Sequence, residues 1–108
     1  FINPSINDVK ISKELNADCI EIHTGKYCRL LNMSKKTDIE FAKLKKTAFF
    51  ANKNDLEVHA GHGLTYMSAL NISKIKTILE FNIGHFIVSE SIFLGMKNTI
   101  RKFKKIIN

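Results

Sequence analysis

Acidic, imidazole and amide side chains recur at alternate positions in three short apolar stretches of this chain. The stretches cover residues 19–25, 56–63 and 79–85, and each ends in glycine, histidine or both. Alternation of apolar and polar residues is the period-two pattern of a β-strand. A strand needs no glutamate, histidine or asparagine for its own structure, whereas a strand that ends at a ligand site does. Because ligand sites collect at the carboxyl ends of parallel strands, we expect these side chains to face the site of an α/β enzyme.

Two glycine–histidine turns in these stretches suit a phosphate group. They are Gly61-His62-Gly63 and Ile83-Gly84-His85. Phosphate prefers backbone N–H groups at a glycine-rich turn or a helix N-terminus, where partial positive charge gathers. Glycine lets such a group approach closely, and His85 can donate a hydrogen bond to it. Histidine also titrates near neutral pH and burial can tune a glutamate, so the same stretches suit proton transfer.

Other interpretations of these side chains stay open. Glu21 could belong to a polar network inside the fold, we expect His23 and Glu57 to be structural, and Gly63 and Gly84 could serve only tight turns. A metal-dependent hydrolase is one alternative function, because histidine nitrogens and carboxylate oxygens are common metal ligands. Its ligands would be drawn from a set of five side chains: His23, Glu57, His59, His62 and His85. A fragment that binds phosphate ligands without catalysis is another.

The composition limits the class of protein. The chain has 108 residues, of which 44% are hydrophobic, enough for one small segment with its own core. No apolar run approaches the ~20 residues that cross a bilayer. No secretory signal is visible either, so we expect no membrane partner and a cytoplasmic location. Cys19 and Cys28 fit a reducing compartment; we expect no disulfide between them and place Cys19 in a buried strand.

The net charge of +7 comes with clustered basic residues. Most of them fall opposite the apolar stripe of a predicted helix, which predicts solvated helix faces. A nucleic-acid site would interleave exposed aromatic residues or carry a recognition motif, and neither is visible, so we expect no nucleic-acid partner. Four phenylalanines near the clusters are expected to face inward: Phe41, Phe49, Phe93 and Phe103.

Strands and helices are predicted to alternate without an internal domain boundary. Residues 1–3 resemble the end of a strand, so we expect further chain before Phe1. Three full strands are predicted by alternation, at residues 19–23, 56–60 and 79–83. Four helices are predicted by apolar periodicity, at residues 5–16, 37–52, 68–74 and from 89 onward. A polar loop is expected around three residues after the first full strand: Lys26, Tyr27 and Cys28.

Local signals refine the helices. Ser5 with Asp8, and Thr37 with Glu40, have the spacing of capping boxes. The last helix is expected to present one apolar face, made of Phe93, Met96, Ile100, Phe103 and Ile107.

The strand faces discriminate between two parallel architectures. Each predicted strand has one apolar face and one face that carries carboxylate, imidazole or amide groups. A doubly wound sheet is covered by helices on both faces and has continuous apolar strands. A barrel with helices outside and a polar interior fits better. Because a (β/α)8 barrel takes ~250 residues, residues 1–108 are predicted to form a single segment that supplies about half of one.

Three motifs resemble, in this order and spacing, the C-terminal half of the pyridoxine 5'-phosphate synthase family. They are Ile20-Glu21-Ile22-His23-Thr24-Gly25, Ala60-Gly61-His62-Gly63-Leu64-Thr65-Tyr66 and Glu80-Phe81-Asn82-Ile83-Gly84-His85, and the resemblance extends to Ile92-Phe93-Leu94-Gly95. The resemblance implies a homo-octameric (β/α)8 barrel with no cofactor or metal. It implies condensation of two phosphorylated small molecules, 1-deoxy-D-xylulose 5-phosphate and 3-amino-2-oxopropyl phosphate, into pyridoxine 5'-phosphate. Residues 1–3 would end the fifth strand, and the three full strands would be the sixth to eighth.

The resemblance also implies roles for individual residues. His62 matches a proton donor after the seventh strand, and Glu21 matches a glutamate that supports the transition state. Three further positions match residues that bind the amino ketone phosphate: Gly63, Gly84 and His85.

Three departures from the family pattern accompany these matches. His59 stands where asparagine is usual and would alter charge near the mouth, and Glu90 stands where arginine is common. The family's N-terminal half, with its other catalytic histidine and glutamate, has no counterpart in residues 1–108.

Overall fold

The computed structural model describes residues 1–108 as three strands and six helices that alternate along the chain. The strands are β1 (Cys19–His23), β2 (Glu57–Gly61) and β3 (Glu80–Asn82). The helices are α1 (Ile6–Glu14), α2 (Gly25–Asn32), α3 (Asp38–Lys53), α4 (Tyr66–Ile72), α5 (His85–Leu94) and α6 (Met96–Ile107). The predicted α/β class and the three predicted strands are confirmed.

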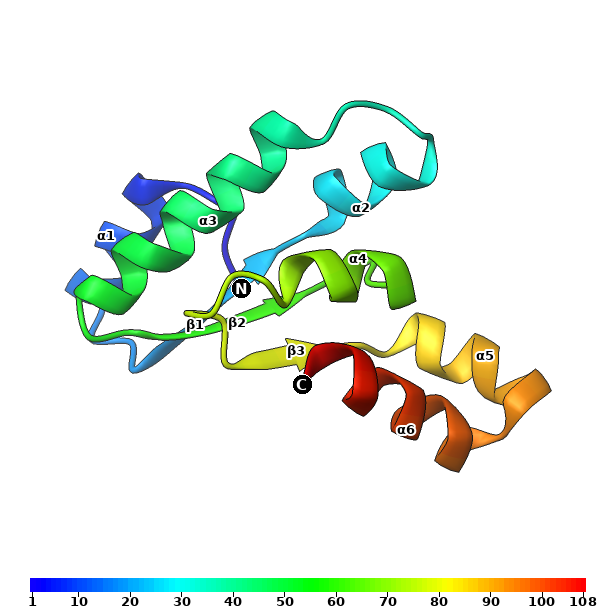
Figure 1. The fold of residues 1–108 in the computed structure, drawn as a ribbon. Helices are drawn as coiled ribbons and strands as arrows, with labels where there is room; N and C mark the ends of the chain where they lie inside the picture. The colour runs from blue at the N-terminus through cyan, green and yellow to red at the C-terminus, as the bar shows by residue number, and fades with distance from the viewer.

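The strands form one open parallel sheet in the order β1-β2-β3 (Figure 1). On the other side of β1, Ile2 makes a parallel bridge to Ile22, which confirms a strand end near the start of the chain. The register pairs His23 with Gly61, and Gly61 with Asn82. The three strands therefore end side by side, and the segments that follow them converge at one edge.

The two faces of the sheet differ as predicted. On one face, Ile20, Ile22, Val58 and Ala60 are buried in a core shared with α1, α3 and α4, to which these helices contribute Val9, Leu44, Ala48, Ala51 and Ile72. The other face carries Glu21, His23, Glu57, His59, Glu80 and Asn82, all half-buried or exposed. Burial of apolar area on one face holds the segment together, and the polar face is left free for chemistry.

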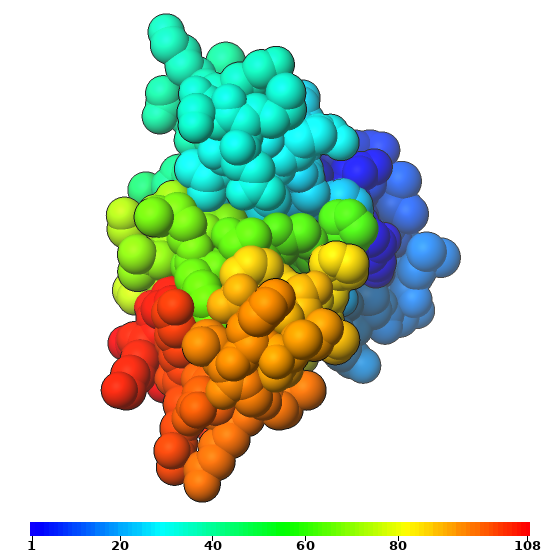
Figure 2. All heavy atoms as spheres, turned by 90° about the vertical axis from the view of Figure 1, so that its right-hand side faces the viewer, coloured from blue at the N-terminus to red at the C-terminus, as the bar shows by residue number.

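Helices α5 and α6 pack against each other and extend away from the body of the sheet (Figures 1 and 2). Their contact with α4 is aromatic: the Tyr66 ring lies 5.0 Å from that of Phe86 and 4.6 Å from that of Phe103. The Lys102 ammonium lies 3.9 Å from the centre of the Tyr66 ring, a cation–π contact. This cluster fixes α5 relative to the end of β2, where the sequence predicts the site.

The expected polar loop after the first full strand is wrong, because residues 25–32 form helix α2. Tyr27 and Cys28 are buried in the core, and the Tyr27 ring lies 6.0 Å from that of Phe41. Burial raises the pKa of the Cys28 thiol. The apolar contacts of these two side chains with the rest of the fold, rather than local propensity, stabilise so short a helix.

The prediction of a single last helix is also wrong. The chain is already helical from His85 and breaks at Gly95, whose φ of +78° lies in the left-handed region. Because the break turns α6 independently of α5, one apolar stripe cannot run through both. Phe103 is buried, whereas Phe93 is 84% exposed and Met96 and Ile100 are also exposed. Phe49, expected inside, is 55% exposed as well.

Two smaller expectations fail for identifiable reasons. The Thr37 side chain makes no cap hydrogen bond, because the Thr37 backbone, with φ −115° and ψ −4°, is helical and not extended. The Glu40 carboxylate, which would complete a capping box, instead lies 2.9 Å from the Lys26 ammonium and 3.4 Å from that of Lys43. Burial acts to raise the pKa of Glu40, but the hydrogen bonds from both lysines outweigh it and leave that pKa below its ordinary value. Cys19 is exposed because it lies on the same face of β1 as Glu21 and His23, and both cysteines are free thiols. At α1, the Ser5 hydroxyl does accept the Asp8 N–H, as predicted.

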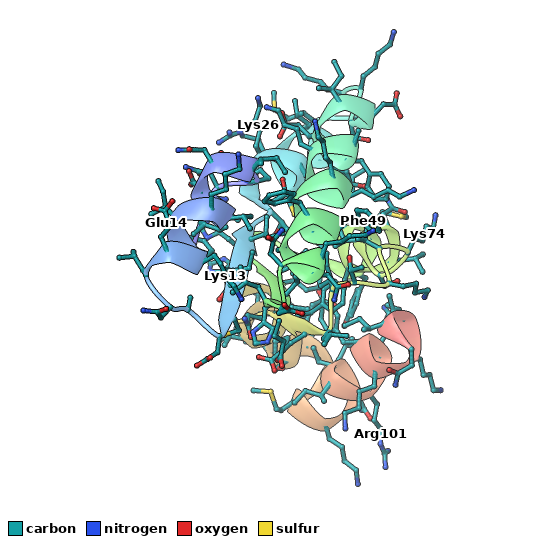
Figure 3. All side chains as sticks on the ribbon, turned by 90° about the vertical axis from the view of Figure 1, so that its left-hand side faces the viewer. Lys13, Glu14, Lys26, Phe49, Lys74 and Arg101 are labelled. Atoms are coloured by element: carbon teal, nitrogen blue, oxygen red, sulfur yellow. The ribbon has the colours of Figure 1, made fainter.

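The basic residues are spread over several elements. Lys26 on α2, Lys74 after α4 and Arg101 on α6 lie at separate places on the periphery (Figure 3), and all three are exposed. No helix of the structure has the length and apolar character required to span a bilayer.

We expect residues 1–108, expressed alone, to aggregate, to dimerise or to melt without a sharp transition. The sheet has open edges, and large apolar side chains such as Leu79, Ile92 and Phe93 are 67%, 78% and 84% exposed. Light scattering after size-exclusion chromatography, together with a thermal melt, measures this. A monodisperse monomer with a sharp cooperative melt would contradict it.

Candidate functional site

A cavity of about 430 Å³ opens at the carboxyl ends of the three strands. All five predicted site residues line it: Glu21, His62, Gly63, Gly84 and His85. The remaining lining residues come from the same strand ends and the first residue of the chain: Phe1, Leu64, Asn82, Ile83 and Phe86. Residues as far apart in the sequence as Phe1 and Phe86 thus share one space.

His62 is held in an unusual backbone conformation directly after β2. Its φ is +81°, in the left-handed region that few residues with a side chain adopt, and Gly63 follows with φ +76°. The other such non-glycine positions are Asn16, Ser34 and Asp55. Two successive left-handed residues turn the chain sharply and leave the His62 side chain exposed at the cavity. Such strain is characteristic of functional turns, because the surrounding structure must maintain it.

The end of β1 maintains this turn through Thr24. The Thr24 hydroxyl lies 2.8 Å from the carbonyl oxygen of Gly61 and 2.7 Å from that of His62. The Thr24 N–H donates to the same Gly61 carbonyl at 2.8 Å. Thr24 is fully buried, so these bonds are shielded from water. Sequence reasoning missed Thr24, because its contacts join segments 37 and 38 residues away.

Glu21 projects from β1 across the backbone of Gly61. A Cβ added at Gly61 would collide with Oε1 of Glu21 and would lie 3.2 Å from the Asn82 carbonyl oxygen. Glycine at position 61 therefore allows the half-buried carboxylate to reach the cavity wall between β1 and β3. Packing against Glu21 therefore requires glycine at position 61, a reason that sequence reasoning missed.

Gly84 and His85 start helix α5 at the opposite wall. Gly84 is the N-cap residue and supplies no side chain, and a Cβ placed there would meet nothing within 4 Å. The first N–H groups of α5 have no partner inside the helix, so they carry partial positive charge toward the cavity. His85 is exposed beside them. This wall can bind an anion, since it offers backbone donors, an imidazole and open space.

His62 also borders a second cavity of about 480 Å³, which no hydrophobic residue lines. Its wall includes His23, Gly25, Lys26 and Arg29. The His23 and His62 rings lie against each other in a tilted arrangement, with centroids 4.6 Å apart and planes at 30°. Burial lowers the pKa of His23, the charges of His62 and Arg29 lower it further, and the charge of Glu21 acts in the opposite direction.

His59 does not line the first cavity. Its Nε2 is 2.7 Å from Oε1 of Glu57, and its Nδ1 is 3.6 Å from Oε1 of Glu80. The expected effect of His59 on charge at the mouth stays a prediction. No three His, Cys, Asp or Glu side chains are arranged to hold a metal ion, so the ligand set of the metal-dependent alternative does not assemble.

Comparison with known proteins assigns the family. Residues 1–108 match the family described as pyridoxal phosphate biosynthesis protein PdxJ. The chain belongs to this family. It is 52% identical over 108 residues to the pyridoxine 5'-phosphate synthase of Pelagibacter ubique (strain HTCC1062). The aligned residues cover 100% of this chain and 45% of that relative. It is 44% identical over 107 residues to that of Sulfurihydrogenibium sp. (strain YO3AOP1), covering 99% of this chain and 43% of the relative.

The chain thus spans less than half the length of the curated PdxJ-family relatives that it matches. The family resemblance inferred from the three motifs is confirmed.

Gly61 and Gly84, at the ends of two strands, predict different responses to an added methyl group. In the complete protein, Gly61→Ala should lower the free energy of unfolding by about 1–3 kcal/mol, the usual cost of overpacking. Glu21 would have to leave its place, and the Asn82 carbonyl leaves little room. Gly84→Ala is the matched control and should leave stability nearly unchanged, because its surroundings are open. Denaturant unfolding of both variants measures this, and equal losses would contradict the assigned packing.

Proposed function

We propose that this chain carries the second half of the active site of a pyridoxine 5'-phosphate synthase. The reaction joins 1-deoxy-D-xylulose 5-phosphate to 3-amino-2-oxopropyl phosphate, forms the pyridine ring of pyridoxine 5'-phosphate and releases phosphate and water. One observation carries the proposal: the family match covers every residue, and the five residues that it points to line one cavity. Relatives with the printed name of this enzyme support the same activity.

We propose further that the open sheet is half of a (β/α)8 barrel. Three features support this: all pairings are parallel, neighbouring strands follow sequence order from Ile2 through β3, and helices cover the apolar face. A doubly wound sheet reverses its strand order and buries both faces. The face that bears Glu21 and Asn82 would then line the barrel interior, closed by strands that precede Phe1.

The wall formed by Gly63, Gly84 and His85 would bind the phosphate of the amino ketone. In barrels, such a site commonly follows the last two strands and uses a helix N-terminus. The unpartnered N–H groups at the start of α5 match the phosphate oxygens in charge, and the space at Gly84 admits them. His85 would add one donor from its side chain.

His62 would act as a proton donor, and Glu21 would support the transition state. Ring formation proceeds through imine formation, enolisation and loss of water, and each step moves protons. His62 is exposed on the cavity, at the end of a turn that leaves its ring next to the anion wall. Glu21 faces the same space from β1, where a carboxylate favours developing positive charge on nitrogen.

We propose self-association as part of this function, with a homo-octamer as the assembly. The exposed apolar side chains of α5, among them Val88, Ile92 and Phe93, support burial against other parts of the protein.

His62→Asn should lower kcat by roughly 10²–10⁴-fold in the complete protein, the usual contribution of general acid–base catalysis. Asparagine tolerates a positive φ, so the turn should persist and the melting temperature should change little. Steady-state kinetics with both substrates and a thermal melt check this. Near-normal turnover with an intact fold would remove His62 from the mechanism.

His85→Asn should act on binding rather than on chemistry. We expect KM for 3-amino-2-oxopropyl phosphate to rise about tenfold, equivalent to ~1.4 kcal/mol of binding, with a smaller change in kcat. KM for the sugar phosphate should stay within about twofold, because the anion wall is assigned to the amino ketone. His59→Asn serves as the matched control, since His59 lies outside the cavity. Equal effects of both variants would contradict the assignment.

A further inference from the structure

The segment His23-Thr24-Gly25, at the end of β1, contacts the turn that carries His62. Thr24 holds the backbone of the turn, as described above, and the His23 ring covers one face of the His62 ring. His23 borders the second cavity but not the first. Among the residues that line the first cavity, Phe1 and His62 have rings that lie against the His23 ring, and His62 is the proposed proton donor.

A backbone hydrogen bond sets the protonation of His23. The Gly25 N–H donates to Nδ1 of His23 at 3.0 Å, so Nδ1 must carry a lone pair and the ring proton must lie on Nε2. The charged groups around this ring are His62, Arg29 and Glu21, with Lys26, Lys43 and Glu40 along the same cavity. Apart from the two carboxylates, all of them oppose a positive charge on His23. His23 is thus held neutral where its neighbour has to carry a proton.

The surroundings of Gly25 give independent support for the contact between the His23 and His62 rings. Gly25 is not in the left-handed region, so its backbone does not itself require glycine. A Cβ at this position would instead collide with Cε1 of His23 and would lie 2.8 Å from Cδ2 of His62. The two rings together require glycine here. The centre of the Phe1 ring lies 4.8 Å from that of the His23 ring, and this contact limits the movement of His23.

We infer that His23 is a positioning residue for His62: its neutral ring, fixed by Gly25 and Phe1, holds the plane of the His62 imidazole toward the substrate. A neutral aromatic face tolerates a stacked imidazolium, whereas a second cation would repel it. The role goes beyond the structural one expected from the sequence, because it concerns the orientation of the proton donor. This inference rests on the proposed function of His62.

A double-mutant cycle in the complete protein tests the inference. His23→Gln should lower kcat by about 10- to 100-fold, as small misplacements of a reacting group do, while KM changes little. In the His62→Asn background, the same substitution should have no further effect on kcat, because its effect passes through His62. His59→Gln is the matched control and should keep kcat. His59 is a half-buried histidine on the same face of the sheet, and it lines neither of the two cavities.

Nitrogen-15 NMR of the imidazoles gives a readout that needs no activity. We expect His23 to show the Nε2–H tautomer and to stay neutral below the pH at which an ordinary histidine, with a pKa of 6.5, takes up its proton. An Nδ1–H or charged His23 at neutral pH would overturn the inference, as would additive losses of kcat in the double variant. An inactive wild-type protein with the expected tautomer would instead contradict the proposed function alone.

Gly25→Ala provides a second test of the inference that does not depend on the folding of the His23 variant. The added methyl group would displace both rings without removing either, so kcat should fall as in His23→Gln while the melt stays cooperative. Wild-type kcat in a folded Gly25→Ala protein would show that the stack has no role in turnover.

Discussion

A buried hydroxyl joins the ends of two strands, and the geometry of the site depends on it. Thr24 bonds to the carbonyl oxygens of both Gly61 and His62, and it does so without exposure to water. An unpaired carbonyl in that position would cost more than a typical hydrogen bond contributes, so the turn is favoured in one arrangement. From that arrangement follow the direction of the His62 side chain, the contact of its ring with His23 and the separation of the two cavities.

The division of each strand into an apolar and a polar face explains how one small sheet can fold and also carry a site. Apolar residues such as Ile22 and Val58 bury their surface under α1, α3 and α4, which offsets the entropy of ordering the chain. The polar face contributes little to that burial. Its side chains are consequently free to be selected for charge and hydrogen bonding, as with Glu21 over Gly61.

The sequence predicted the strands and the cavity residues well, because both follow local rules. Period-two alternation identifies strands, and parallel pairing brings strand ends such as Glu21, His62 and Gly84 to one edge. Failures occurred where distant contacts decide the structure. Tyr27 and Cys28 form a helix because the core buries them, and Gly95 separates two helices that periodicity had merged. Thr24 and His23 were missed as supports for the same reason, since no spacing in the sequence reveals bonds between β1 and the turn after β2.

The left-handed backbone at His62 constrains the evolution of this position in two ways at once. A substitution there must satisfy the chemistry of the site and must also tolerate a φ of +81°, which excludes β-branched side chains and disfavours most others. Neutral drift at this codon is therefore confined largely to glycine, asparagine and aspartate, even in a protein that no longer needs the proton donor. Invariance of this histidine among descendants would overstate selection for catalysis, whereas its replacement by asparagine or glycine would be the expected trace of lost activity on a retained fold.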